Sequence, residues 1–426
     1  MIYFHNPHFS TFYGTNLFNA LTGRFNHRKY WFIGTYILRP PMEGAGILIN
    51  LDQNSFHMLF TYKVPFLNRI VSLCELAVWL AINRVNPLRV PIIFSPGRLT
   101  PQDVVMVFAF DNLQRPVSLL GDLAKAPCIK VVHLTHYQAH TGDIARHAKE
   151  LGTVFFAAEN NLTGYPYFTR HFPYYTKDTY LLPFVPQPRF VRRTPFARRK
   201  VKCLALGTLL AYKRTPATMD VMDFFGTDCV HPMRRAIYDN RETIGDTIAS
   251  CVTLFYADAT AREFSAQQGP LTKVYNALWN VINAKQKTYF SFKTSDRFNE
   301  YAMFVIPEEI NHLPGISWVE GMACGAAYIG INDRMYTDLG LVPGTHYIAY
   351  DNTLQGLRDV VKYYQQNTGA LERIAENGYN FVRERLNGER AARVFFSDLR
   401  QLSTQAAAAV PPDRLKFHCS FVKETQ

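Results

Sequence analysis

The stretch Tyr301–Asn332 combines residue types that could bind a phosphorylated ligand. An apolar run leads into a loop that contains Gly315, and a helix is predicted from about Ser317 until a glycine ends it. The amides at such a helix start, together with the helix dipole, favour an anion, and glycine lets a ligand approach the backbone. The backbone at Leu313, Gly315 and Ile316 is therefore predicted to contact a diphosphate.

A carboxylate follows in the first turn or so of this predicted helix. Glu320 could accept two hydrogen bonds from the hydroxyl groups of a ribose, and hydrogen bonds to a charged carboxylate are stronger than neutral ones. A diphosphate loop followed by a ribose-binding carboxylate is the arrangement that a nucleotide requires. The segment therefore predicts a nucleotide site.

The same segment resembles the donor-binding signature of retaining GT-B glycosyltransferases, especially family four (glycosyl transferases group 1). In that signature a strand ends in Pro, and then come Glu, seven residues, a second Glu and Ala-Met-Ala-Cys-Gly. Pro307, Glu320 and Met322–Gly325 match, and the likeness extends back to Leu182–Phe190. It covers about 180–385 well and the first half loosely. The resemblance implies an α/β chain with the GT-B fold, two Rossmann-like domains that face each other across a cleft.

The first glutamate of that signature is missing. Eight residues before Glu320 stands His312, where the family usually places a glutamate that contacts the donor sugar. The resemblance implies that His312 could hydrogen-bond a sugar hydroxyl at the catalytic site. Two alternatives are that Glu308 or Glu309 reaches the sugar instead, or that His312 is merely structural.

Fixed cations would stabilise a departing nucleoside diphosphate, on which negative charge accumulates. Where the family has Gly-Arg-Leu, three residues and then Lys, this chain has Gly207–Arg214, GTLLAYKR. Gly207 and Lys213 match, whereas Thr208 replaces the arginine. The resemblance implies that Gly207 and Lys213 bind the diphosphate, with Lys213 also supporting catalysis, and Arg214 is a candidate for the missing charge. A surface lysine is the alternative for Lys213.

Two further residues in the first half match the family more loosely. The segment 127–133, PCIKVVH, resembles the buried strand that ends in a histidine beside the reaction centre, which makes His133 a catalytic candidate. His136 and His140 follow closely, so the functional histidine could be one of them, and a core or strand-capping histidine is the alternative. Gly14 stands where these enzymes have a first loop that touches the diphosphate.

No two aspartates in the chain are separated by a single residue, so the Asp-x-Asp metal signature of the GT-A transferases is absent. We therefore expect no metal and no cofactor. A UDP- or GDP-sugar would be the donor substrate, and Lys213, Arg214 and helix amides would meet the charge on its diphosphate.

Strands and helices are predicted to alternate along the chain, which indicates crossover connections and parallel sheets. We expect an acceptor-binding Rossmann-like domain over 1–190 and a nucleotide-sugar-binding one over 191–385. A C-terminal helix and tail over 386–426 would cross back to the first domain. The predicted strands are Ile92–Phe94, Val104–Phe108, Ile129–His133, Val154–Ala157, Val201–Gly207, Val252–Tyr256, Thr288–Phe292, Met303–Ile306, Ala327–Ile331 and Tyr347–Ala349.

The composition of the chain indicates which kinds of partner and which compartment suit the protein. The formal net charge of +12 favours anionic partners, and no nucleic-acid motif accompanies it. The basic residues within 189–202 form either a solvated connector between domains or a contact with anionic lipid headgroups. Seven cysteines without a CxxC pair fit a reducing cytosol.

Neither a secretion signal nor a membrane span is expected from the sequence. The N-terminus lacks a basic segment followed by an apolar core. The most apolar stretch, Phe66–Val85, contains Arg69, Glu75 and Arg84, so a buried or interfacial amphipathic helix is predicted there.

These observations predict a glycosyltransferase that moves a sugar from a nucleotide sugar to an acceptor hydroxyl. Its aromatic-rich first domain would bind the acceptor, which is a glycan or a lipid-linked molecule. By analogy the setting is cell-envelope polysaccharide or glycolipid assembly, in the cytoplasm or on the inner face of the membrane. One alternative is a catalytically degenerate GT-B partner that binds nucleotide or glycan. The other is a nucleotide-sugar epimerase of similar fold.

Overall fold

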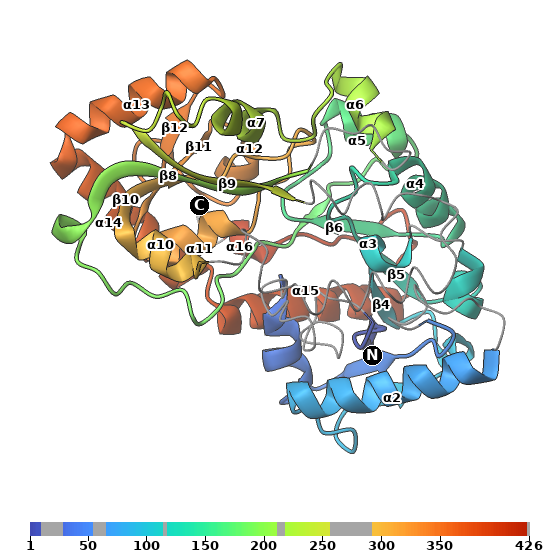
Figure 1. Ribbon diagram of the computed structural model, residues 1–426. Coiled ribbons are helices and arrows are strands. Elements are labelled where there is room, and N and C mark those ends of the chain that lie inside the picture. Colours follow the sequence, from blue (N-terminus) through green and yellow to red (C-terminus); the bar gives the residue numbers. More distant parts are fainter. Residues whose placement is uncertain (10–28, 54–64, 114–116, 211–217, 256–291, 424–426) are drawn as a thin grey trace. The chain divides into compact units, whose positions relative to one another are not determined.

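The computed structural model describes the 426-residue chain except residues 10–28, 54–64, 114–116, 211–217, 256–291 and 424–426. Its described residues divide into two compact units (Figure 1). The first unit contains residues 1–182 and 388–423, and the second contains 183–255 and 292–387. The C-terminal helical segment therefore belongs to the same unit as the N-terminal half of the chain.

The first unit is built on a parallel seven-stranded sheet of order β3-β2-β1-β4-β5-β6-β7. Its central strands β4 and β5 are buried on both faces and mostly apolar, as expected for a parallel sheet that helices cover. The strands are β1 (Ile2–His5), β2 (Ala45–Leu48), β3 (Ile92–Ile93), β4 (Val104–Phe108), β5 (Ile129–His133), β6 (Phe155–Ala158) and β7 (Tyr180–Leu181).

Helices of the first unit come from both ends of the chain. They are η2 (Ile33–Leu38), α2 (Pro65–Asn83), η4 (Pro96–Arg98), α3 (Ala109–Asn112), η5 (Val117–Ala124), α4 (Thr141–Glu150), α5 (Pro166–His171), α15 (Gly388–Ala407) and α16 (Ser420–Lys423). The long helix α15 packs against η2, β1 and β4. Asp398 of α15 is 3% exposed and accepts hydrogen bonds from the Tyr180 hydroxyl (2.8 Å) and the Ser420 hydroxyl (2.6 Å). These bonds join α15 to β7 and α16.

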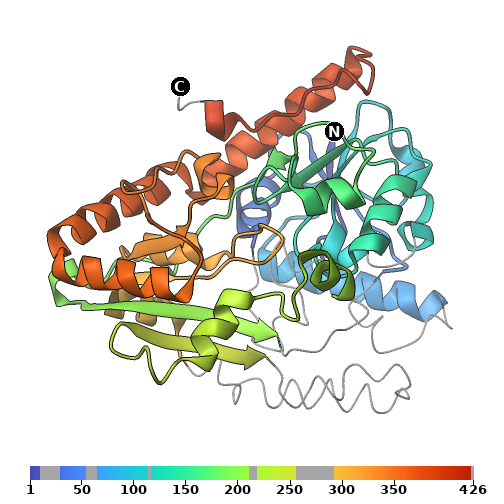
Figure 2. The ribbon, with the colours of Figure 1, turned by 90° about the horizontal axis from the view of Figure 1, so that it is seen from above.

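The second unit holds a parallel five-stranded sheet of order β12-β11-β10-β8-β9. The strands are β8 (Lys200–Leu210), β9 (Ile248–Phe255), β10 (Tyr301–Val305), β11 (Ala327–Ile331) and β12 (Ile348–Tyr350). Figure 2 shows β8 and β9 side by side as the long green and yellow-green strands. The strand predicted to end at Gly207 continues to Leu210, because β9 pairs with it as far as Phe255. Residues 288–291 of the predicted strand Thr288–Phe292 lie outside the described residues.

Seven described helices flank this second sheet: α6 (Met219–Phe225), α7 (Pro232–Asp239), α10 (Thr294–Glu300), α11 (Ser317–Ala323), α12 (Arg334–Thr337), α13 (Leu354–Gln366) and α14 (Thr368–Arg385). Apolar residues of α7, α13 and α14 pack with the strands in one buried cluster that includes Ile237, Val361 and Ile374. This core holds the carboxyl ends of the strands in fixed register.

Most of the basic cluster in 189–202 is bound within the second unit. Arg199 is 5% exposed and donates hydrogen bonds to the carbonyl oxygens of Phe298 (3.1 Å) and Cys324 (2.6 Å). Arg193 pairs with Asp296, and other members pair with glutamates of α10 and α14. These contacts use part of the cluster's charge in holding α10, α11 and α14. The choice between a solvated connector and a contact with lipid headgroups stays a prediction.

Candidate active site

The loop Ile306–Ile316 leaves the sheet at the carboxyl end of β10 and leads into α11. Ligands of open α/β sheets bind beyond this edge of the strands. Gly315 and Ile316 are half-buried here, whereas the side chain of Leu313 is packed in the core with 2% exposure. Leu313 can therefore contribute to a site only through its backbone. Because α11 has only seven residues, its dipole is short, and a diphosphate here would need side-chain cations as well.

Glu320 lies in the first turn of α11 and is 4% exposed. Its carboxylate accepts a hydrogen bond from the Ser317 hydroxyl at 3.0 Å. Burial raises the pKa of Glu320 to about 7, and the charge of Arg189 and the Ser317 hydrogen bond act in the opposite direction. Carboxyl groups with strongly shifted pKa values are common at functional sites. Hydrogen bonds donated by a bound ligand would favour the charged form of Glu320.

Glu308, one of the alternatives for the missing signature glutamate, is hydrogen-bonded to residues of the second unit. Its Oε1 accepts hydrogen bonds from the hydroxyl groups of Tyr336 (2.7 Å) and Tyr328 (3.0 Å). Burial raises the pKa of Glu308, although these hydrogen bonds partly oppose the effect. Glu308 therefore ties the β10 loop to β11 and α12, which makes it a positioning residue.

His312 occupies a left-handed backbone conformation with φ of 59°. Such a conformation is strained for a residue with a side chain, and strain of this kind clusters at functional sites. The ring Nδ1 lies 3.1 Å from Asp333 Oδ2, and the side chain is 33% exposed. Asp333 thus orients an imidazole that solvent or a ligand can reach.

A cavity of about 490 Å³ opens beside His312, wholly within the second unit. Glu308, Glu309, Asn352 and Thr353 supply its polar lining, together with apolar residues of α6 and α7. Its size suits part of a nucleotide sugar. The structure thus brings His312 and both alternative glutamates to one cavity.

Arg234 has no motif that predicts a role for it, yet its guanidinium lies at this edge of the sheet. It is 6% exposed and donates from Nε to the Pro307 carbonyl oxygen (2.9 Å) and from Nη1 to that of Thr208 (3.0 Å). A Cβ placed on Gly207 would come within 2.9 Å of the Arg234 side chain, and one on Gly315 within 3.7 Å of Nη2. Gly207 and Gly315, two of the three glycines that are predicted to contact the diphosphate, therefore lie beside Arg234. The sequence signal was an arginine in the first turn of a helix, where the dipole disfavours cations.

Three predicted site residues, Gly14, Lys213 and Arg214, lie outside the described residues. Their predicted roles remain predictions.

His133 ends β5 as the sequence predicted, but it is fully enclosed. Its Nε2 lies 2.8 Å from the Tyr30 hydroxyl, which donates to Glu159 Oε1 at 3.1 Å. Burial holds the pKa of His133 well below its ordinary value, and the charge of Lys29 acts in the same direction. His133 is thus a neutral core histidine in a buried hydrogen-bonded chain.

His136, the neighbouring candidate, has a different environment. It is half-buried, has a left-handed φ of 51° and contacts the amino group of Lys29. It follows β5 at the carboxyl edge of the first sheet, where ligands bind in this class of fold. His136 is therefore better placed than His133 to contact a ligand.

Substitutions of the two histidines should separate their roles. His133→Ala removes a buried group and leaves Tyr30 and Glu159 without it, so we expect the free energy of unfolding to fall by about 2–4 kcal/mol. His136→Asn, which suits the left-handed backbone, should keep the stability of the wild type while lowering turnover at least about 10-fold. Thermal unfolding and release of nucleoside diphosphate are the measurements. If His133→Ala were stable but inactive and His136→Asn were fully active, His133 would be the functional histidine and this prediction would be wrong.

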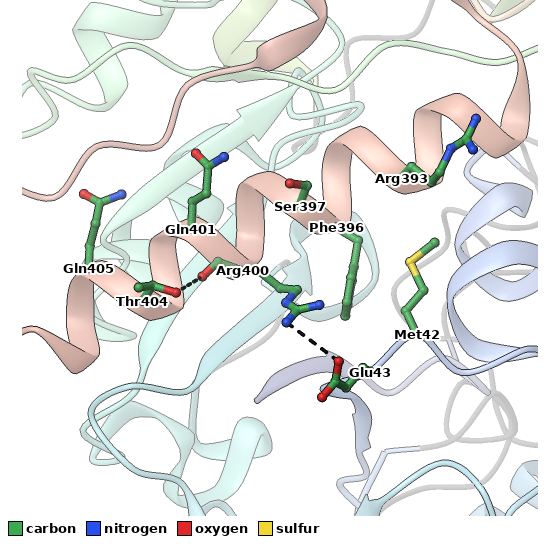
Figure 3. A pocket seen from close by; sticks show the side chains of 9 residues that line it. All are labelled: Met42, Glu43, Arg393, Phe396, Ser397, Arg400, Gln401, Thr404 and Gln405. Atoms are coloured by element: carbon green, nitrogen blue, oxygen red, sulfur yellow. Dashed lines mark hydrogen bonds and ion pairs between the residues drawn. The ribbon is translucent and has the colours of Figure 1, made fainter.

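A second cavity, of about 700 Å³, lies elsewhere on the first unit (Figure 3). It is formed by α15 residues such as Arg393 and Arg400 together with Met42 and Glu43. Arg400 and Glu43 form an exposed ion pair at 4.0 Å. Because Met42 and Glu43 precede β2, this groove lies at the amino end of a strand, away from the edge where parallel sheets bind ligands.

No model of a known protein family matches the chain, and no curated protein matches it. Among solved structures, HepE from Anabaena in complex with UDP and glucose is 12% identical, with a TM-score of 0.50. The match covers 94% of this chain and 99% of that one. A glycosyltransferase from Rickettsia africae ESF-5 is 9% identical, with 94% and 97% coverage and a TM-score of 0.49. Sucrose-phosphate synthase from Thermosynechococcus elongatus is 10% identical, with 96% and 99% coverage and a TM-score of 0.46.

The match to HepE extends over nearly the whole of both chains, and with the two parallel sheets it confirms the predicted GT-B fold. At 12% identity it shows the fold alone.

Proposed function

Given a chain with the GT-B fold, we propose that the protein is a glycosyltransferase that moves a sugar from a UDP- or GDP-sugar to an acceptor hydroxyl. The observation that carries this proposal is the buried Glu320, one turn into α11 and close in sequence to the half-exposed backbone at Gly315. The HepE structure supports a nucleotide donor, because it holds UDP and glucose.

Each site residue then has a definite task. Glu320 accepts hydrogen bonds from the ribose hydroxyls, which favour its charged form and bring its pKa down from about 7. The backbone at Gly315 and Ile316 contacts the diphosphate, and Lys213 stabilises it as it departs. His312, oriented by Asp333, hydrogen-bonds a hydroxyl of the transferred sugar.

The finer features of the reaction rest on the family resemblance and on the residues present. Retention of configuration at the anomeric carbon follows from the retaining family's signature. Lys213, Arg214 and backbone amides would balance the diphosphate charge without a divalent ion. The acceptor is a glycan or a lipid-linked glycan of the cell envelope, reached from the cytoplasmic side of the membrane.

A panel of nucleotide sugars tests the reaction. Incubation with UDP- and GDP-sugars should release UDP or GDP slowly by hydrolysis and faster with an acceptor, and EDTA should leave the rate unchanged. A degenerate binding partner would only raise its melting temperature with the nucleotide, and an epimerase would convert one sugar nucleotide into another without releasing the diphosphate. Either result would overturn the proposal, and loss of activity in EDTA would overturn its metal-independent form.

Exposed apolar residues of the helix α2 support the proposal that the acceptor lies at a membrane. Phe66, Leu67, Ile70 and Leu73 are between 41% and 74% exposed, although they are apolar. The opposite side of the helix is buried and includes the apolar residues Leu76 and Trp79 together with Ser72, which donates a hydrogen bond to the Gln53 carbonyl oxygen. α2 is therefore apolar on its buried side and also on part of its exposed side. By length and composition alone Phe66–Asn83 could cross a membrane, but core helices of soluble proteins pass the same test.

Positive charge accompanies this apolar face. Arg84 and Arg89 just beyond the helix are exposed, as is Leu88 at 94%. Arg69 on α2 is 58% exposed, and Asp52 at 3.1 Å offsets its charge. An amphipathic helix with arginines beside exposed apolar residues suits the surface of an anionic bilayer.

Vesicle co-sedimentation tests this surface. The wild type should bind vesicles of phosphatidylcholine with phosphatidylserine more tightly than vesicles of phosphatidylcholine alone. The double substitution Ile70→Asp and Leu73→Asp should weaken binding at least about 10-fold, since charged groups replace apolar ones at the interface. The control is Tyr363→Asp, which changes an exposed aromatic residue of the second unit. Equal binding to both vesicle types, or no effect of the α2 substitutions, would remove the membrane from the proposal.

A further inference from the structure

Arg234 is a buried cation in an unusual place for a helix. It stands in the first turn of α7, where the positive end of the helix dipole opposes a positive side chain, and no acidic residue stands in that turn. Its neighbour Arg235 avoids this cost by pointing to two carboxylates, Asp228 at 2.7 Å and Asp239 at 3.5 Å. Arg234 instead turns to the carboxyl edge of the sheet, where its bonds to Pro307 and Thr208 fix the guanidinium.

The Arg234 guanidinium lies beside backbone that is partly accessible to solvent. Gly207, Thr208 and Gly315 are each half-buried, and they lie against the Arg234 side chain. At Gly207 a side chain would collide with Arg234, so glycine is required for the arginine to lie there. At Gly315 the nearest guanidinium atom is Nη2, the nitrogen that these two carbonyl bonds do not involve.

Two segments that are more than 90 residues apart in sequence thus meet at one cation. One is the β8 segment with Gly207 and Thr208, and the other is the loop from Pro307 to Gly315 before α11. β10 leaves the sheet after Val305, while β8 continues beside β9, which places this meeting point at the carboxyl edge of the sheet. An anion that contacts the backbone of either segment would come close to Arg234.

We propose that Arg234 supplies the fixed positive charge for the diphosphate of the donor nucleotide. This inference rests on the proposed function and adds a residue to it. Arg234 is held by two carbonyl oxygens before any ligand arrives, so little side-chain entropy is lost on binding. A preorganised guanidinium in a partly desolvated position stabilises a phosphate more strongly than a mobile surface lysine does.

Calorimetric titration with UDP, UMP and uridine, and in parallel with GDP, GMP and guanosine, tests this role. Arg234→Gln should weaken binding of the nucleoside diphosphate by about 10- to 100-fold and leave binding of the nucleoside within about twofold. The matched control is Arg235→Gln, which removes the neighbouring arginine and should change neither affinity.

A structural role alone would give another pattern. If Arg234 only held the two loops together, Arg234→Gln would weaken nucleoside and nucleoside diphosphate equally, and that result would overturn the inference. Should Arg234→Gln fail to fold, Arg234→Lys is the second variant, because lysine keeps the charge but not the fork of donors. It should weaken binding of the nucleoside diphosphate alone, by about 5- to 10-fold. A wild type that binds no nucleotide would overturn the proposed function itself, whereas a wild type that binds UDP or GDP with no dependence on Arg234 would overturn this inference only.

Discussion

Replacing Glu320 by glutamine should weaken binding of the donor nucleotide by about 10- to 100-fold, because two charge-assisted hydrogen bonds to the ribose are lost. The same substitution should make the free protein more stable at pH 8. In the folded protein burial raises the pKa of Glu320 to about 7, from its ordinary value of 4.5. A neutral glutamine can still accept the hydrogen bond from Ser317 without the cost of a buried charge.

The direction of the pH effect follows from this raised pKa. The stabilising contribution of the protonated carboxyl group is complete below pH 4.5 and is lost as the pH rises through about 7. The difference between the two pKa values corresponds to about 3 kcal/mol above pH 7, at roughly 1.4 kcal/mol per pKa unit. Denaturant unfolding of the two proteins should therefore give similar free energies at pH 4.5 and diverge by up to about 3 kcal/mol at pH 8.

The control for Glu320→Gln is Glu372→Gln, which changes an exposed carboxylate on α14 of the same unit. It should alter neither nucleotide affinity nor the pH dependence of unfolding. Unchanged nucleotide affinity in Glu320→Gln would remove Glu320 from the ribose site. Equal stability of variant and wild type at every pH would show that its carboxylate is well solvated.

Replacing Lys213 by alanine should lower kcat by about 10²- to 10³-fold with the fold intact, the usual cost of removing one group that stabilises developing charge. The sequence resemblance assigns this lysine to the departing diphosphate, and Lys213 follows the end of β8 by three residues. Since a departing diphosphate carries more charge in the transition state than in the bound donor, kcat should fall more than donor affinity does.

Steady-state kinetics of nucleoside diphosphate release measures this effect. Lys202→Ala is the control, because Lys202 lies on β8 and donates a hydrogen bond to the Gly245 carbonyl oxygen. Its kcat should equal that of the wild type. Normal turnover in Lys213→Ala would exclude the lysine from the reaction and leave the charge to Arg234 and Arg214.

Local pattern was sufficient for much of the fold. Val104–Phe108, Ile129–His133 and Ala327–Ile331 were predicted as strands and form β4, β5 and β11 with the same bounds, since buried parallel strands are continuous apolar runs between helices. The helix α13 also begins at a local signal, because the Thr353 side chain accepts a hydrogen bond from the Gly356 amide at its start. β1, β2 and β7 were not predicted, because periodicity alone does not distinguish a short apolar run in a strand from one in a helix, so strands of this length are found in some places and missed in others.

The GT-B fold could be predicted from the family resemblance over about 180–385, and the segment around Glu320 from local pattern, because its strand, loop and helix start lie within about thirty adjacent residues. The enclosed position of His133, the hydrogen bonds of Glu308 and the contacts of Arg234 with Thr208 and Pro307 became visible in the folded chain alone. Burial and contact between residues far apart in the chain depend on how elements pack in space. Such packing leaves no pattern in neighbouring residues. The role of Arg234 on α7 could therefore not be found from the spacing of residues in the signature segments.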